Sequence, residues 1–235
     1  MDYKLDSHMH TVASGHAYNT IMEMAKAAAD KKLELVAVTE HSVNMPGTCQ
    51  LFYFMNLKMV PRQLFGIEVL QGAELNITDY KGSTDLPIEI QKKLDVCIAS
   101  LHLPCITPGS MKENTAALLG VMENPCVSII GHPDDGRYPI DYRELARAAA
   151  ERHILLEVNN HSLDPVSSRT GARENLAVML KWCETFGTYV ILNSDAHWCG
   201  DIGDRRFSGP LLEEMCFPEE LVVNRDVALY RSFLK

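Results

Sequence analysis

Short apolar runs alternate along the chain with longer stretches of helical character. The β-prone runs occupy residues 35–39, 69–74, 94–100, 127–131, 154–159 and 189–193, and a weaker one opens the chain at residues 3–6. The helical stretches occupy residues 21–32, 114–122, 141–152 and 173–186, with Asn114 and Asp141 predicted as N-caps. A repeated order of apolar strand, loop and helix indicates βα units around a parallel sheet. Seven strands in one domain favour a closed barrel over a small open sheet.

Histidines and carboxylates follow the apolar runs, at the points where the predicted strands end. In a βα-barrel these C-terminal strand ends gather at one face, where the active-site loops lie. An open doubly wound sheet also binds ligands at strand ends, but usually at one crevice. Because six separate strand ends contribute here, the pattern favours a barrel. The residues concerned are His8, His10, His16, His41, Glu74, His102, His132, Asp195 and His197.

These residue types are metal ligands. Neutral imidazoles mixed with carboxylates form the ligand sets of zinc, manganese and iron. His8 and His10 are alternate residues of an extended segment, so both rings project to the same face. Asp195 and His197 repeat this spacing, and Glu74 can bridge two ions through its two oxygens. Nine such groups exceed the needs of one tetrahedral ion, which predicts a multinuclear site.

Two residues beyond the sixth strand are expected to contact substrate. Arg169 can clamp a phosphate bidentately, because a guanidinium matches phosphate geometry, and Arg173 is the alternative. His161 lies at the mouth of that strand and is expected to touch substrate or to orient a ligand. His153 follows a helix and is predicted to be a helix-end residue without a role in the site.

Composition limits the partners of the chain. With 235 residues and 46% hydrophobic content, residues 1–235 are expected to form one domain. The net charge of −9 argues against a nucleic-acid partner without excluding one, since phosphate backbones are bound by clustered Lys and Arg. The seven cysteines form no C-x-x-C pair, which indicates neither a disulfide framework nor a zinc ribbon. Without a leader or an apolar stretch of about 18 residues, we expect a cytoplasmic protein with no membrane association.

The order of these motifs resembles that of the PHP family, the polymerase and histidinol-phosphatase superfamily of metal-dependent phosphoesterases. Residues 6–11 match its D-x-H-x-H opening, and residues 39–41 match its second motif. Residues 72–74, His102, residues 131–133 and residues 194–197 match the remainder in order. Residues 11–18 and 157–160 are most similar to those of the stand-alone, YcdX-like bacterial phosphatases.

The resemblance implies a distorted (βα)7 TIM-like barrel with three divalent ions in its mouth, zinc being expected and manganese or iron the alternatives. One ion would be bound by His8, His10, Glu74 and Asp195. A second would be bound by Glu74, as a bridge, with His102 and His132, and a third by His16, His41 and His197. One departure is visible at Glu40, where the family's second motif usually reads T-D-H. An acidic residue is kept, so we expect an adjustment around the ligands and no lost site.

We therefore expect a phosphatase that attacks a small phosphomonoester with a metal-bound hydroxide. Glu74, Asp195 and His197 are the residues expected to carry catalysis. Histidinol phosphate is one candidate substrate, but fold does not determine substrate. The sequence gives no indication of the oligomeric state.

Three alternatives stay open. A PHP-type exonuclease or phosphodiesterase would use the same chemistry on nucleic acid. A catalytically inert metal-binding module would support a partner protein, but the complete ligand set argues against it. An amide-hydrolysing barrel enzyme shares the D-x-H-x-H motif, but it usually needs a carboxylated lysine, and no Lys ends a predicted strand here.

Overall fold

Seven parallel strands, adjacent in chain order, form the sheet of the computed structural model, which describes residues 3–235. Every strand predicted from the apolar runs is present, with shifted ends. A short strand that the sequence did not predict, β3 (Gln63–Leu64), pairs antiparallel with β4. The parallel strands are β1 (Leu5–Met9), β2 (Leu35–His41), β4 (Ile67–Asn76), β5 (Val96–Ser100), β6 (Val127–Ile130), β7 (Leu155–Asn159) and β8 (Val190–Asn193).

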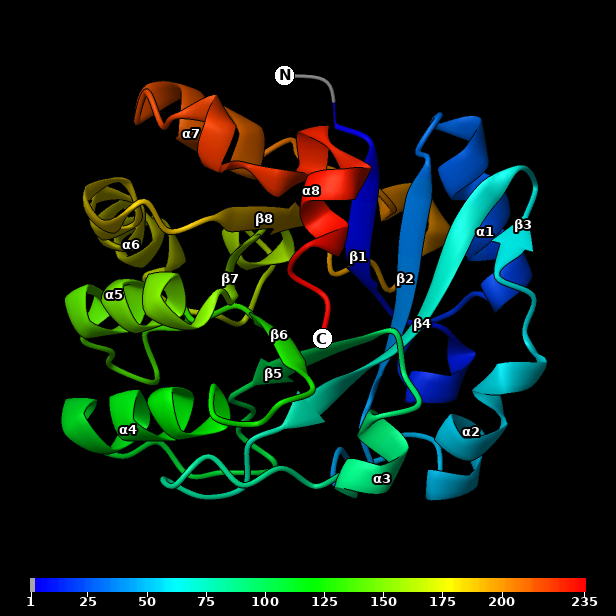
Figure 1. Cartoon of the computed structure of the whole chain (residues 1–235), viewed down its shortest axis with the longest axis horizontal. Helices are drawn as coiled ribbons and strands as arrows, with labels where there is room; N and C mark the ends of the chain where they lie inside the picture. Colours follow the sequence, from blue (N-terminus) through cyan, green and yellow to red (C-terminus); the bar gives the residue numbers. More distant parts are fainter. Residues whose placement is uncertain (1–2) are drawn as a thin grey trace.

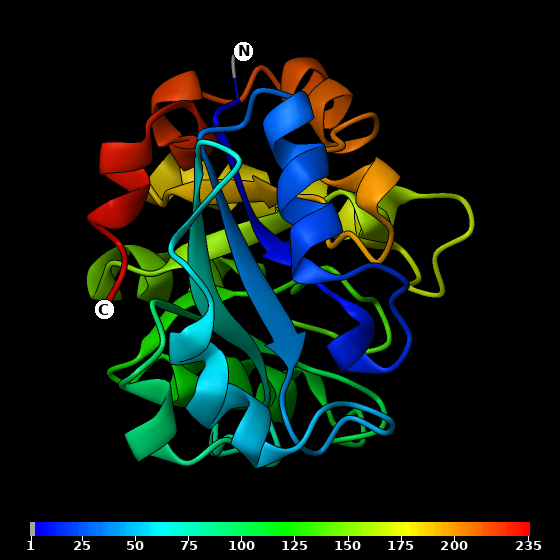
Figure 2. The ribbon, with the colours of Figure 1, turned by 90° about the vertical axis from the view of Figure 1, so that its right-hand side faces the viewer.

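Helices surround the strands, so the predicted distorted TIM-like barrel is confirmed (Figures 1 and 2). The four predicted helices are α1 (Ile21–Asp30), α4 (Met111–Val121), α5 (Tyr142–Arg152) and α6 (Ala172–Phe186). The shorter ones are α2 (Leu51–Asn56), α3 (Ile88–Gln91), α7 (Ser208–Glu214) and α8 (Val227–Arg231). Single 3-10 turns are η1 (Val12–Ser14), η2 (Leu57–Met59), η3 (His161–Leu163), η4 (Cys199–Asp201), η5 (Glu219–Leu221) and η6 (Val223–Arg225). Within residues 3–235, none of the helices has the length and apolar character needed to span a bilayer.

The two predicted N-caps have different outcomes. Asp141 caps α5, where its side chain accepts the Glu144 N–H at 3.1 Å. The prediction for Asn114 is wrong, because α4 begins upstream with Ser110 as its cap. Ser110 and Glu113 form a reciprocal capping box, which satisfies two backbone N–H groups at the start of the helix. The S-x-x-E spacing of this box is visible in the sequence.

Alternate strand residues fill the barrel interior, and the segment around helix α8 covers the end of the barrel at which the strands begin. Apolar side chains near the N-terminal ends of the strands pack against Tyr230 and Phe233 of the C-terminal segment, which are both buried. In Figure 1, α8 accordingly lies across the strands with the C-terminus at the centre of the view. Since this end is apolar and covered, the polar residues are left at the opposite, C-terminal ends. The apolar strand residues are Leu5, Leu35, Ala37, Leu70, Val96, Ile98, Ile129, Leu155 and Ile191.

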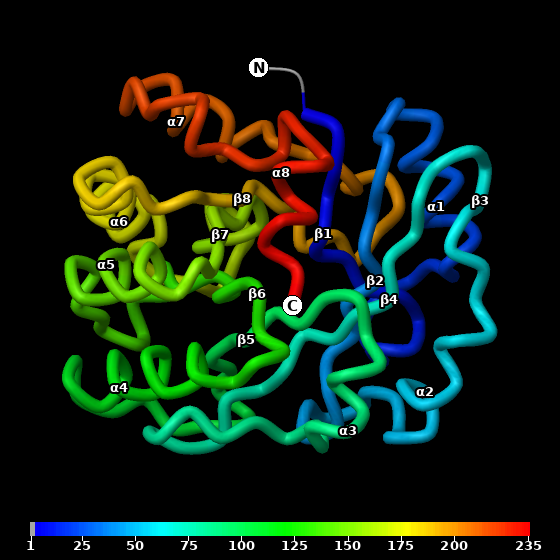
Figure 3. The backbone as a smooth tube through the Cα atoms, in the orientation of Figure 1, coloured from blue at the N-terminus to red at the C-terminus, as the bar shows by residue number. Residues whose placement is uncertain are grey.

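Side chains close the barrel between its first and last strands. In place of a continuous ladder, an isolated backbone bridge between Met9 and Ala196 joins β1 to the chain after β8. Asn224, fully buried, donates from Nδ2 to the carbonyls of Leu192 and Leu5 at 2.7 and 3.1 Å, and its Oδ1 accepts the Leu192 N–H at 2.8 Å. Asn193 adds a further link, since its Oδ1 accepts the Ser7 N–H at 2.9 Å. Two amide side chains thus link the first and last strands where a continuous ladder of backbone hydrogen bonds is missing from the described residues 3–235. The tube in Figure 3 shows the C-terminal segment beside β1 and β8.

Replacing Asn224 by Ala is therefore expected to destabilise the fold by about 3 kcal/mol. The change removes the partner of the buried N–H and C=O of Leu192, and each such group costs about 1–3 kcal/mol, whereas the Leu5 carbonyl keeps its hydrogen bond from Arg205. Urea denaturation would measure the loss, with the exposed Asn56→Ala as the control. A loss below about 1 kcal/mol would show that the seam does not depend on this amide.

Candidate metal centre

All nine predicted ligand residues converge at the C-terminal end of the barrel. β1 carries His8 and leads to His10, β2 ends at His41, and β4 carries Glu74. The others lie in loops: His16 follows η1, and His102, His132, Asp195 and His197 follow β5, β6 and β8. Parallel strands place these ends at one mouth, as the sequence predicted. His16 lies at the outer edge of the cluster, where the centre of its ring is 4.9 Å from that of His41.

Glu74 is the centre of the cluster. Its carboxylate is completely buried, and the ring nitrogens of five histidines surround it. Its two oxygens face different sets of rings, as a bridging carboxylate would. Oε2 lies 2.7 Å from His41 Nδ1 and 3.5 Å from Nε2 of both His8 and His10, while Oε1 lies 2.8 Å from His132 Nε2 and 3.2 Å from His102 Nε2.

Asp195, in the loop after β8, faces two of the same rings. Its Oδ1 lies 3.3 Å from His10 Nε2 and 3.5 Å from His8 Nε2. The backbone of Asp195 is left-handed, with φ of +54°, and that of His132 has φ of +25°. Such conformations cost energy for residues with a Cβ and persist where surrounding contacts enforce them. Both therefore occur where the chain turns a side chain into the cluster.

In the described part of the chain, residues 3–235, three groups of potential ligands have donor atoms within 4.8 Å of one another. They overlap with the expected division into three sites but do not coincide with it. His41, expected beside His16 and His197, also lies beside Glu74. The three groups are His8, His10 and Glu74; His41, Glu74 and His102; and His10, His41 and His197.

The donor set fits divalent ions. Four buried atoms at the centre make no hydrogen bond to any residue in the range 3–235, although buried polar atoms are normally paired. They are Glu74 Oε2, Asp195 Oδ1, His41 Nδ1 and His102 Nε2. Each is a nitrogen or oxygen donor type that binds zinc, manganese or iron. Coordination to cations is the bond that these unpaired atoms are suited to make.

The charges within the cluster also suit metal binding. Burial alone would raise the pKa of Glu74 and Asp195, but nearby histidines outweigh it and hold both well below the usual range. Burial, with the adjacent His41, lowers the pKa of His10 well below its ordinary value. Burial opposes the charge on His8 as well, yet the surrounding carboxylates raise its pKa. Ionised carboxylates and a neutral His10 are the protonation states that metal ions require, whereas His8 would have to release a proton to bind one.

Glu157 is a site residue that the sequence reasoning missed. It is fully buried on β7, and its Oε1 lies 2.7 Å from His8 Nδ1. Its Oε2 accepts the His132 N–H at 2.7 Å. Nearby Asn159 donates to Glu157 and to Asp195. A carboxylate inside an otherwise apolar strand run was the available signal, since a buried charge needs partners.

A cleft of about 480 Å³ opens above the cluster. Arg169 forms part of its wall and donates from Nη2 to Asp195 Oδ2 at 3.1 Å and from Nη1 to Ser162 Oγ at 3.0 Å. His161 is exposed at the rim, with its ring 6.3 Å from that of His197. Met45, Leu101, Leu103 and Pro104 contribute apolar surface to the lining. The cleft is lined by Met45, Leu101, Leu103, Pro104, Asp135, Arg137, Ser167 and Ser168, with His16, His41, His102, His161, Arg169, Asp195 and His197.

Arg137 is a second cationic residue of this wall that sequence reasoning did not identify. Its guanidinium is bound through two nitrogens to Asp135, at 2.5 and 2.9 Å. Burial works against the ionised form of Asp135, but the bonds to Arg137 hold its pKa below the usual range. The result is a fixed ion pair at the cleft, in a loop that no motif distinguishes.

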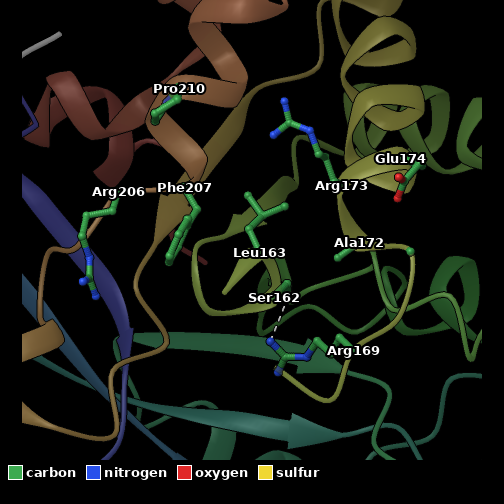
Figure 4. Close-up of a pocket in the computed structure, with 10 residues that line it drawn as sticks. Ser162, Leu163, Arg169, Ala172, Arg173, Glu174, Arg206, Phe207 and Pro210 are labelled. Carbon is green, nitrogen blue, oxygen red and sulfur yellow. Dashed lines mark hydrogen bonds between the residues drawn. The ribbon is translucent and has the colours of Figure 1, made fainter. Parts of the chain in front are cut away.

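A separate hollow of about 360 Å³ lies beyond Arg169 (Figure 4). Figure 4 shows Arg169 hydrogen-bonded to Ser162, with Arg173 well apart from it. Arg173 is exposed and pairs with Glu214, so it does not line the metal cleft. The alternative of Arg173 as the phosphate clamp is therefore not supported.

The prediction for His153 is confirmed, because it ends α5 in a left-handed conformation and stacks on Phe233.

Fold and site together define a class: βα-barrel proteins with a carboxylate-centred histidine cluster at the C-terminal ends of their strands. A family model for the PHP domain matches residues 6–161, and the chain belongs to this family. The chain is 46% identical over 235 residues to a probable phosphatase of Clostridium novyi (strain NT), covering 100% of this chain and 96% of that protein.

Two solved structures share the fold. One is the histidinol phosphate phosphatase of Lactococcus lactis, in complex with zinc, L-histidinol and phosphate, with a TM-score of 0.62, 20% identity and coverage of 92% of this chain and 95% of that one. The other belongs to an archaeal ribonuclease P structure with mature tRNA, with a TM-score of 0.60, 16% identity and coverage of 97% and 90%. At these identities the likeness concerns the fold alone.

Proposed function

We propose that this protein is a metal-dependent phosphatase that hydrolyses a small phosphomonoester at a centre of three divalent ions. The observation that carries this proposal is the convergence of nine ligand-type side chains around Glu74, directly below an arginine-bearing cleft. The naming of its relatives as probable phosphatases supports the same reaction.

Glu74 would be the shared ligand of the centre. His8, His10 and Asp195 would complete one site, and His102 and His132 a second. His16, His41 and His197 would form the third. Bound there, divalent ions would acidify a water molecule and neutralise charge on the phosphoryl group, with zinc expected and manganese or iron as alternatives.

The residues of the cleft would bind and orient the substrate. Arg169 is held in place by Asp195 and Ser162, so its guanidinium is positioned at the edge of the cluster without further ordering. It would bind the phosphate oxygens, and His161 at the rim would contact the remainder of the substrate. The apolar wall formed by Leu101 and Leu103 would pack against the organic group. A cleft of about 480 Å³ suits a metabolite better than a polymer.

Replacing Arg169 by Ala is expected to lower kcat/KM by about 10- to 100-fold, mostly through KM. A hydrogen bond to a charged group contributes about 1.5–3 kcal/mol, and each 1.36 kcal/mol is tenfold. Steady-state kinetics on a phosphomonoester would measure the change. The matched control is Arg173→Ala, which removes a guanidinium outside the metal cleft and should change kcat/KM less than about twofold. Equal effects of both substitutions would argue against a phosphate contact at Arg169.

The test of the proposed function is a comparison of three substrates on metal-replete protein. We expect turnover of p-nitrophenyl phosphate to exceed that of bis-p-nitrophenyl phosphate and of a single-stranded oligonucleotide. A screen of phosphorylated metabolites, histidinol phosphate included, would then identify the natural ester. Cleavage of the oligonucleotide far above monoester hydrolysis would instead establish a nuclease. If the gently purified protein contained well under one equivalent of metal and showed no activity, the result would establish an inert module.

A further inference from the structure

The hydroxyl of Ser14, in the turn η1, lies at the meeting point of three contacts. His10 Nδ1 lies 3.0 Å from Ser14 Oγ, and the His41 N–H donates to the same oxygen at 3.1 Å. Ser14 Oγ is also 2.5 Å from Glu40 Oε2. Ser14 and Glu40 are both fully buried. A hydroxyl has one proton to donate and two lone pairs to accept, so these three contacts use its whole capacity.

This arrangement determines the tautomer of His10. Glu40 is a carboxylate that already accepts the N–H of Thr11 and its hydroxyl, so the proton between Ser14 and Glu40 comes from Ser14. Ser14 must then accept from His10, which places the ring proton on Nδ1. The unprotonated Nε2 of His10 is thereby directed at Glu74 and Asp195, at 3.5 and 3.3 Å. A ligand histidine needs this lone pair.

An equivalent chain of contacts lies behind His102. Its Nδ1 is 2.7 Å from Asn76 Oδ1. The amide of Asn76 is oriented by its nitrogen, which donates to Asp85 Oδ2 at 2.7 Å and to the Ser42 carbonyl at 3.1 Å. Oδ1 is therefore the atom that faces His102 and accepts its Nδ1–H. His102 Nε2 is left without a proton and points at Glu74.

We infer that Glu40 and Asp85 are positioning residues that act on two ligand histidines through one intermediary each, Ser14 and Asn76. Each fixes the orientation of its histidine ring, as Glu157 does for His8 by direct contact at 2.7 Å. Carboxylates behind metal-binding histidines orient the ring and increase its basicity. This inference rests on the proposed function only in taking His10 and His102 as ligands.

The Glu40 relay also accounts for the acidic residue that departs from the T-D-H pattern. Glu40 lies on β2, whereas its partners Thr11 and Ser14 lie around η1, after β1. Its long side chain spans this distance and binds both ends of the turn. Ser14 in turn joins His10 of one strand to the backbone of His41 on the next. One buried network therefore holds two ligands from neighbouring strands in register.

The test uses the full-length, zinc-loaded protein with three substitutions. Ser14→Ala removes the intermediary, and Glu40→Gln keeps the size of the side chain but loses acceptor capacity. Tyr53→Phe is the matched control, because the Tyr53 hydroxyl donates to Glu40 at 3.3 Å but lies outside the relay. Two readouts are independent of activity: zinc affinity and stoichiometry against a competing chelator, and the Nδ1–H signal of His10 in spectra of 15N-histidine-labelled protein.

Ser14→Ala and Glu40→Gln are expected to weaken zinc binding by about 10- to 100-fold and to make the His10 Nδ1–H exchange faster, with Tyr53→Phe close to wild type. Wild-type affinity together with an unchanged His10 signal in both variants would overturn the inference. If Ser14→Ala does not fold by circular dichroism, Glu40→Gln decides the question alone. Wild-type protein that binds zinc but cleaves no phosphoester would refute the proposed function and leave the relay standing.

Discussion

Replacing Glu74 by Gln is expected to lower kcat/KM by at least about 10³-fold and to reduce the bound metal by one ion or more. The two oxygens of the Glu74 carboxylate face different sides of the cluster, one 3.5 Å from His8 Nε2 and the other 2.8 Å from His132 Nε2. An amide keeps the size but loses the charge and one acceptor. Charge stabilisation by a catalytic metal contributes several kcal/mol, and about 4 kcal/mol corresponds to this factor.

Steady-state kinetics and elemental analysis of the purified variant would measure both effects. Glu89→Gln is the matched control, because Glu89 is exposed on α3 and pairs only at the surface with Lys92. It should change neither activity nor metal content. A Glu74→Gln variant with full metal content and activity within about tenfold of wild type would refute the central role of this carboxylate.

Removal of the metal ions is expected to abolish activity and to lower the melting temperature by roughly 10 °C. A ligand that binds only the folded state at about 1,000 times its Kd contributes about 4 kcal/mol. For a chain of this size each kcal/mol is about 2–4 °C. Dialysis against a chelator, followed by calorimetry and by assay before and after zinc or manganese is restored, would measure both quantities.

The Glu74→Gln variant is also the control for this experiment. Because this variant lacks the shared carboxylate ligand, the chelator should lower the melting temperature of the variant by less than half as much as it lowers that of the wild type. If the wild-type protein kept its activity through exhaustive chelation, the catalytic centre would not depend on metal ions. Loss of activity without recovery on adding metal would point to irreversible unfolding, which calorimetry would show directly.

Much of this site could be predicted from the sequence because its information is local. The apolar runs predicted every parallel strand, since strand formation follows short-range hydrophobic patterning. Because strand side chains alternate, His8 and His10 were predicted to share a face, and their Nε2 atoms lie 3.2 Å apart. The parallel arrangement then required that the ends of separate strands meet.

Other features could not be predicted, because they depend on contacts between distant segments. Glu157 is separated from His8 by 149 residues, and the apolar run around it gives no sign of that partner. Asn224 closes the barrel across a seam that sequence periodicity does not describe. The close approach of His41 Nδ1 to Glu74 Oε2, at 2.7 Å, likewise joins residues of two different strands that no local pattern relates.

The sequence by itself determined which donors this protein offers and at which strand ends they lie. These properties follow from residue type and from the two-residue period of a strand. Only the tertiary structure decided which nitrogen of His10 and of His102 faces Glu74, and that Arg169, rather than Arg173, lines the cleft. The reason is physical: the tautomer and direction of a buried ring depend on the hydrogen-bond partner behind it. Asn76 and Glu157 are distant in sequence from His102 and His8, and Ser14, although close to His10 in sequence, is oriented by Glu40 of the next strand.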